Sequence, residues 1–183
     1  MRKLIASINM TLDGFCDHTA GIADEELHQN ANDLLKSVDT LLFGRITYQL
    51  MENSWPAIVK EPTGVKSVDE FAVLIDTMPK IVFSNTLTKL EWKNSRLANG
   101  SLKEIVTQLK QQSGKGLLVG SPSLIVSLMQ LGLIDEYRFC VHPVVLGKGL
   151  VLFKNITERI TLRLMKTECN RSGAVTLFYE PVK

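Results

Sequence analysis

The chain has 183 residues, 45% of them hydrophobic, and its 21 basic and 19 acidic residues leave a formal net charge of +2. This length suits one domain with its own core, so we expect residues 1–183 to form a single domain. The charges form no basic stripe, which argues against a nucleic-acid partner.

The cysteines and the N-terminal residues indicate the cellular setting. Cys16, Cys140 and Cys169 are far apart, odd in number and without a paired metal-ligand spacing, which is typical of reduced thiols in a cytoplasmic protein. We therefore expect no metal site and no disulfide framework. Polar residues interrupt the first apolar stretch after the basic residues 1–3, so neither a signal peptide nor a membrane span fits.

Apolar periodicity predicts strands and helices that alternate through the first two thirds of the chain. The expected elements are a strand at 3–10, a helix at 24–37, a strand at 40–43, a helix from Ile46, a short helix at 69–76, a strand at 80–84, a helix over 102–109 and a strand at 117–119. Residues 53–68, with Pro56, Pro62 and Gly64, predict an irregular loop, and loops of that length often border a functional site.

The pattern changes to strands alone after Asp135. We expect strands at 136–142, 160–168 and 174–181, with residues 170–173 as a hairpin turn. Repeated strand-to-helix crossovers imply a parallel sheet covered on both faces. The predicted fold class is α/β, with a mostly parallel central sheet, helices on both faces and a C-terminal antiparallel hairpin.

One strand-to-helix junction carries residues suited to holding phosphate. An apolar run meets Gly44, Arg45 and Thr47 just before a helical pattern begins. Glycine lets a ligand approach the backbone, the free N–H groups of a helix start favour anions, and arginine and threonine add a charge and a hydroxyl. Glycine at such a junction is also ordinary turn chemistry, so the motif alone leaves both readings open.

A second junction of this kind follows the strand at 117–119. Gly120 ends the strand, Ser121 suits the N-cap and Pro122 suits the first helical position. Two helix starts that favour anions suit a ligand with two phosphate groups.

Polar or small residues therefore follow several strands of the predicted sheet. Ligands of parallel α/β sheets bind at the carboxyl ends of the strands. A single ligand can touch four such positions if their strands are neighbours, namely Gly14, Gly44, Ser84 and Gly120.

In combination these segments resemble the dihydrofolate reductase-like proteins. The resemblance is closest to the reductase domain of the bifunctional riboflavin-biosynthesis deaminase/reductase and its free-standing bacterial relatives, and it spans essentially the whole chain. It is carried by Ala6-Ser7, Leu12-Asp13-Gly14, Gly44-Arg45-Ile46-Thr47, Val82-Phe83-Ser84, Val119-Gly120, Gly132-Leu133-Ile134-Asp135-Glu136 and His142-Pro143-Val144-Val145-Leu146-Gly147.

The resemblance implies a dihydrofolate reductase-like fold, NADPH as cofactor and hydride transfer to a small ribosylamino-pyrimidine phosphate. Arg45 would lie near the adenosine 2′-phosphate and Ser84 near the adenosine, although Ser84 is equally suited to ending its strand. The residues assigned to the cofactor are Ala6, Gly14, Gly44, Arg45, Thr47, Ser84, Gly120, Ser121, Ser123 and Leu124.

The chain departs from the family pattern at two positions. Gly120-Ser121-Pro122 stands where relatives have a run of glycines, and the added side chain and missing N–H are expected to reduce cofactor affinity. Asn85 stands where relatives often have a basic residue, which weakens the preference for NADPH over NADH. The zinc-ligand motifs of the deaminase half are missing, so deamination is excluded.

Few residues suit the chemistry at the acceptor. The resemblance makes Asp13 the best catalytic candidate, with Ser7 and Asn9 beside it on one strand face, although Asp13 is equally suited to bonding its own turn. The candidates for substrate contact are Tyr48, Trp55 and His142, and packing is the alternative for each of them.

The sequence allows more than one substrate and suggests an oligomeric state. The acids 24–26 begin the helix that carries the pterin-binding acid in dihydrofolate reductases, but helix starts favour acids anyway, so a dihydrofolate or pteridine substrate stays an alternative. A second alternative is a homologue that binds the nucleotide but catalyses no reaction. Lys148 and Arg171 are available for a substrate phosphate. A homodimer is expected through apolar positions of the terminal strands, namely Leu162, Leu164, Val175 and Leu177.

Overall fold

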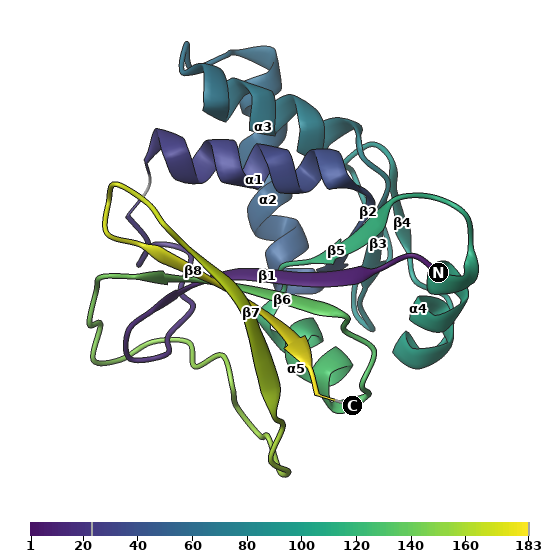
Figure 1. Ribbon diagram of the computed structural model, residues 1–183. Helices are drawn as coiled ribbons and strands as arrows, with labels where there is room; N and C mark the ends of the chain where they lie inside the picture. The colour runs from purple at the N-terminus through teal and green to yellow at the C-terminus, as the bar shows by residue number, and fades with distance from the viewer. Residues whose placement is uncertain (23, 183) are drawn as a thin grey trace.

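Eight strands form one mixed sheet, as the computed structural model shows for the residues it describes, 1–22 and 24–182. The strands are β1 (Leu4–Thr11), β2 (Val38–Gly44), β3 (Lys80–Phe83), β4 (Ser95–Leu97), β5 (Gly116–Val119), β6 (Glu136–His142), β7 (Leu162–Cys169) and β8 (Val175–Pro181). Their order is β4-β3-β2-β5-β1-β6-β8-β7 (Figure 1). The first six are parallel, whereas β8 runs antiparallel to both β6 and β7, so the predicted fold class is confirmed.

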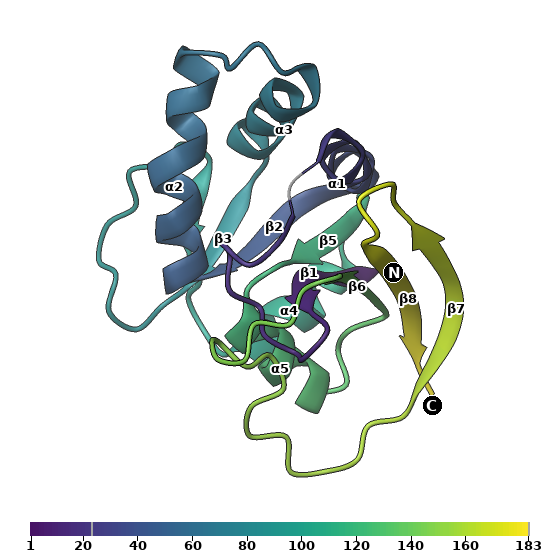
Figure 2. The ribbon, with the colours of Figure 1, turned by 90° about the vertical axis from the view of Figure 1, so that its left-hand side faces the viewer.

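Helices cover both faces of this sheet. They are α1 (Glu25–Ser37), α2 (Arg45–Lys60), α3 (Lys66–Thr77), α4 (Leu102–Gln111) and α5 (Pro122–Gln130). The helices α1, α2 and α3 lie together on one face, and α4 and α5 lie on the other (Figures 1 and 2). Within the described part of the chain, no helix combines the length and the apolar character needed to span a bilayer.

Local side-chain caps fix the starts of α1 and α4. The Asp24 carboxylate accepts the Leu27 N–H at 2.7 Å and caps α1. Ser101 and Glu104 form a reciprocal capping box at the start of α4. These side chains satisfy N–H groups that a helix leaves without internal partners.

The expected loop over residues 53–68 is wrong. The helix α2 continues to Lys60 with Pro56 inside it, and α3 already begins at Lys66 rather than at 69. Packing between the two helices explains this outcome, because the rings of Trp55 and Phe71 lie 4.5 Å apart between their centroids. The short strand β4 was also not predicted.

The core has two parts, one on each face of the sheet. Leu4 and Ala6 of β1 belong to the cluster that includes α4 and α5, whereas Ile5 belongs to the cluster that includes α1, α2 and α3. Because side chains alternate along a strand, Ser7 and Asn9 point to the same face as Ile5. The two polar candidates of β1 therefore face the side of α1.

Candidate functional site

The carboxyl ends of four neighbouring strands carry the residues singled out in the sequence. The strands β3, β2, β5 and β1 are consecutive in the sheet and parallel. Just beyond or at their ends come Ser84, Gly44, Gly120 and Gly14. One ligand can touch all four positions only if their strands are neighbours, and this condition is therefore confirmed.

The two helix starts at the centre of this edge are joined directly. The backbone N–H of Gly44, the N-cap residue of α2, donates a 2.9 Å hydrogen bond to Oγ of Ser121, the N-cap residue of α5. A Cβ atom built on Gly44 would lie 3.5 Å from Oγ of Ser123 and 3.6 Å from Cβ of Ser121. Ser121 is the N-cap residue as predicted, but its side chain does not cap its own helix.

Arg45 stands at this junction as an exposed cation. Its guanidinium donates to Gln49 Oε1 at 3.3 Å, and no carboxylate among residues 1–22 and 24–182 pairs with it. Thr47 follows half-buried in the first turn of α2, and Ser123 is exposed in the first turn of α5. A free guanidinium beside two positive helix ends forms an environment that favours an anion.

A cavity of about 370 Å³ lies at the ends of β3 and β4, beside the start of α4. Ser84 and Asn85 line it, together with residues the sequence did not indicate, namely Phe83, Ala98, Gly100, Ser101 and Leu102. The Ser84 hydroxyl accepts the N–H groups of Thr86 and Leu87 and so also ends the strand. The capping-box pattern of Ser101 and Glu104 was a sequence signal for the start of α4, which forms this wall of the cavity.

Asp13 is fixed by its own loops rather than directed toward Arg45 or Ser121. Its carboxylate accepts the Thr11 hydroxyl at 2.6 Å and the Gly147 N–H at 2.7 Å, and it also accepts the Leu146 N–H. These hydrogen bonds, chiefly that from Thr11, lower the pKa of Asp13 to about 2. The side chain is exposed and ionised at neutral pH.

The polar face of β1 meets β6 in register. Ser7 pairs with Arg138 and Asn9 with Cys140, so these four side chains share one face of the sheet. A Cβ on Gly120 would lie 3.4 Å from the Ser7 carbonyl oxygen, which places the end of β5 beside this row. Arg138 is a basic residue of the row that the sequence reasoning missed, because a strand pattern does not show which residue it pairs with.

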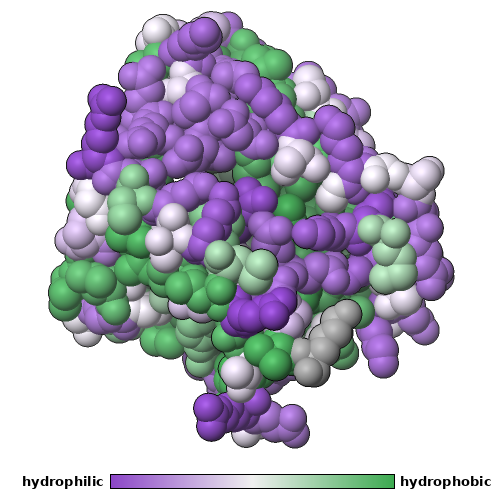
Figure 3. Space-filling model, in the orientation of Figure 1, coloured by the Kyte–Doolittle hydropathy of each residue, from purple (hydrophilic) through white to green (hydrophobic). Residues whose placement is uncertain are grey.

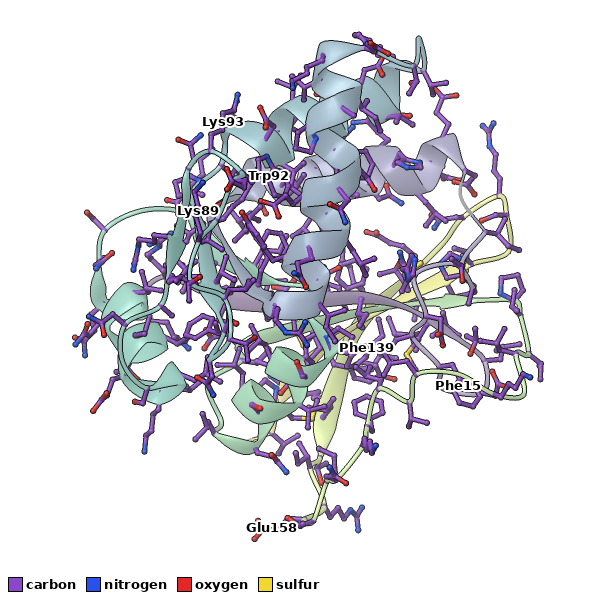
Figure 4. All side chains as sticks on the ribbon, turned by 180° about the vertical axis from the view of Figure 1, so that it is seen from behind. Phe15, Lys89, Trp92, Lys93, Phe139 and Glu158 are labelled. Carbon is purple, nitrogen blue, oxygen red and sulfur yellow. The ribbon has the colours of Figure 1, made fainter. Side chains whose placement is uncertain are left out.

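Two aromatic candidates lie in the packing of the helical layer. Tyr48 is 1% exposed, and its hydroxyl donates to Glu52 and accepts the N–H of Trp92. Trp92 lies beside α2 (Figure 4). Trp55 packs on Phe71, about 15 Å along α2 from Arg45 at 1.5 Å per residue. For Tyr48 the packing alternative therefore holds, whereas Trp55 is half-buried and its contact with a substrate stays a prediction.

His142 is a buried anchor at the end of β6. It is 2% exposed, and its Nδ1 accepts the N–H of Ile22 at 3.0 Å. Burial lowers the pKa of His142, so the ring is neutral and its accepting nitrogen is in use.

Two residues assigned to the cofactor, Ala6 and Leu124, also belong to the core. Ala6 can therefore offer only its backbone to a ligand.

The remaining candidates lie at the surface. Lys148 is exposed in the loop after β6, and the Arg171 N–H donates to Glu26 at 2.8 Å, which docks the hairpin turn on α1. The edge strand β7 exposes Leu164. Figure 3 shows a hydrophilic cover over α1 and α3, with apolar surface gathered below it.

Comparison with known proteins identifies the family. The family model described as the RibD C-terminal domain matches residues 2–177. The chain is 33% identical over 182 residues to the uncharacterized protein YyaP of Bacillus subtilis (strain 168), which covers 97% of this chain and 94% of YyaP.

Solved structures show the same fold. A diaminohydroxyphosphoribosylaminopyrimidine deaminase/5-amino-6-(5-phosphoribosylamino)uracil reductase from Thermotoga maritima is 19% identical with a TM-score of 0.70, over 99% of this chain and 57% of that chain. A dihydrofolate reductase from Enterococcus faecalis, complexed with NADP(H), is 14% identical with a TM-score of 0.63, over 99% of this chain and 97% of that chain. The chain belongs to the RibD C-terminal domain family and has a dihydrofolate reductase-like fold.

Proposed function

We propose that this chain is an NADPH-dependent reductase that transfers hydride to a small pyrimidine carrying a ribosylamino phosphate, a reaction of the riboflavin-biosynthesis type. Membership of the RibD C-terminal domain family supports an oxidoreductase. The single observation that carries the proposal is the bond from Gly44 to Ser121, because it joins two anion-favouring helix starts at the middle of four adjacent strand ends.

The residues at this edge fit a dinucleotide phosphate. The first N–H groups of a helix have no partner inside it, so the N–H groups of Arg45, Ile46 and Thr47 on α2 and of Ser123 and Leu124 on α5 are suited to a pyrophosphate. Pro122 has no N–H to offer. In this proposal the Arg45 guanidinium pairs with the 2′-phosphate, and the cavity beside Ser84 and Asn85 takes the adenosine.

At the other end of the site the protein orients the acceptor. NADPH supplies the hydride when it is bound. Ser7 and Asn9 present polar groups on the face shared with Arg138. The Arg138 guanidinium donates through Nε to Glu136 at 2.7 Å, and in this proposal its remaining N–H groups pair with the substrate phosphate. With a pKa of about 2, Asp13 carries no proton at neutral pH, so in this proposal it holds the loop over the site and the acceptor's proton comes from water.

The test is whether NADPH binds at Arg45. We expect NADPH to raise the thermal midpoint of the purified protein, and Arg45→Ala to lose most of that rise. Lys60→Ala, at the far exposed end of the same helix, is the matched control and keeps the rise. An unchanged wild-type midpoint at millimolar NADPH contradicts the proposal.

Turnover separates an enzyme from a homologue that only binds nucleotide. We expect the wild-type protein to oxidise NADPH in the presence of 5-amino-6-(5-phosphoribosylamino)uracil. Binding without any oxidation of NADPH by this substrate or by dihydrofolate favours the non-catalytic alternative.

A further inference from the structure

We propose that Ser121 is a positioning residue whose hydroxyl sets the spacing of the two phosphate-binding helix starts. This inference rests on the proposed function and deepens it. It concerns how tightly the NADPH pyrophosphate is held, and it predicts the opposite of what the sequence alone suggests for this position.

The geometry gives the Ser121 side chain an inward direction. Ser121 is 1% exposed, and its Oγ accepts the N–H of Gly44, which is itself buried. A side chain in this position does not stand in the path of a ligand outside the strand ends. The sequence departure from the glycine run therefore does not act as a steric obstacle.

The bond also decides which donors face a ligand. Because the Gly44 N–H is already in use, the phosphate donors on α2 begin at Arg45. The bond holds this first donor at a fixed place relative to Ser123 on α5, because the two starts lie so close that a Cβ atom on Gly44 would be in contact with Oγ of Ser123. Two helix ends held at one spacing bind a pyrophosphate without first having to be ordered.

Removal of the hydroxyl has a clear physical consequence. With alanine or glycine at position 121, the buried Gly44 N–H loses its acceptor, and water or a movement of α2 must satisfy it. Either response changes the spacing of the two helix starts. We expect NADPH affinity to fall by about tenfold, the effect of losing one well-placed interaction of this kind.

The test compares NADPH dissociation constants, measured by titration at 10 °C on folded protein, for the wild type, Ser121→Ala, Ser121→Gly and Ser121→Thr. We expect Ser121→Ala and Ser121→Gly to bind about tenfold more weakly, and Ser121→Thr, which keeps the hydroxyl, to recover most of the affinity. Ser127→Ala is the matched control, because the Ser127 hydroxyl donates to the Ser123 carbonyl one turn along α5 and makes no other hydrogen bond within residues 1–22 and 24–182.

Two further readouts separate positioning from general loss of stability. Positioning predicts a higher KM for NADPH with an unchanged KM for the pyrimidine substrate, and it predicts faster hydrogen exchange at the Gly44 amide in Ser121→Ala. Equal or tighter NADPH binding by Ser121→Gly overturns the inference while leaving the proposed function intact. Failure of the wild type to bind NADPH overturns the proposed function itself, and the inference with it.

Discussion

The Asp13 carboxylate accepts the backbone N–H of Gly147 at 2.7 Å, across 134 positions of sequence. The turn after β1 and the loop after β6 are further joined by the hydrogen bond from the Leu12 N–H to the Val144 carbonyl. The loop after β6 is therefore fastened to the end of the strand that carries Ser7 and Asn9.

The hydrogen bonds accepted by the Asp13 carboxylate predict that the thermal stability of the protein depends on the ionisation of Asp13. The folded state lowers the pKa of Asp13 from 3.8 to about 2, so its contribution is complete above pH 4 and is lost as the pH falls toward 2. Asp13→Asn should lower the thermal midpoint at pH 6, and the difference from wild type should shrink between pH 4 and pH 2.

The control for Asp13→Asn is the same substitution of a carboxylate elsewhere on the surface. Asp33→Asn, on the exposed side of α1, should change the midpoint little across the same range of pH. A difference for Asp13→Asn that stays constant down to pH 2.5 in thermal unfolding would show that the carboxylate charge is not what holds the loop.

Asn85 predicts a route to a stronger preference for NADPH. It is exposed on the wall of the cavity that the proposed function gives to the adenosine. We expect Asn85→Arg to improve kcat/KM for NADPH relative to NADH by about threefold to tenfold, because arginine pairs with the 2′-phosphate that NADH lacks. Thr88→Arg adds the same charge outside the residues that line the cavity and should leave the ratio unchanged.

Lys80 predicts a large effect on stability away from the site. It is 0% exposed, and its Nζ donates to the carbonyls of Asp76, Met78 and Lys93 at 3.0, 2.9 and 3.3 Å. Lys80→Met leaves three carbonyls without this donor, which should lower the free energy of unfolding by about 3 kcal/mol. Lys66→Met, at the exposed start of α3, should cost less than about 0.5 kcal/mol in the same urea titration.

The fold could be predicted largely from local patterns. The strand at 3–10 and the helix at 24–37 differ from β1 and α1 by a single residue at one or both ends, because long apolar repeats and a capping aspartate fix them. The loop at 53–68 was mispredicted because Pro56 reads as a breaker, whereas packing of Trp55 on Phe71 keeps the helix continuous.

The site was less accessible to sequence reasoning. Arg45 and Ser121 could be singled out from their local motifs, but the bond from Gly44 to Ser121 joins residues 77 positions apart and leaves no local signal. The inward direction of Tyr48 and His142 likewise depends on which neighbours the fold supplies. The order of the strands decides both the bond and the inward direction of these side chains, and no single segment of the sequence encodes that order.

A crystal structure of the protein with NADP⁺ shows directly where the cofactor binds. We expect the pyrophosphate against the helix starts at Arg45 and Ser123, the 2′-phosphate within ion-pair distance of the Arg45 guanidinium, and the adenosine in the cavity beside Ser84. NADP⁺ bound at any other place on the sheet, with these helix starts left in water, would contradict this expectation.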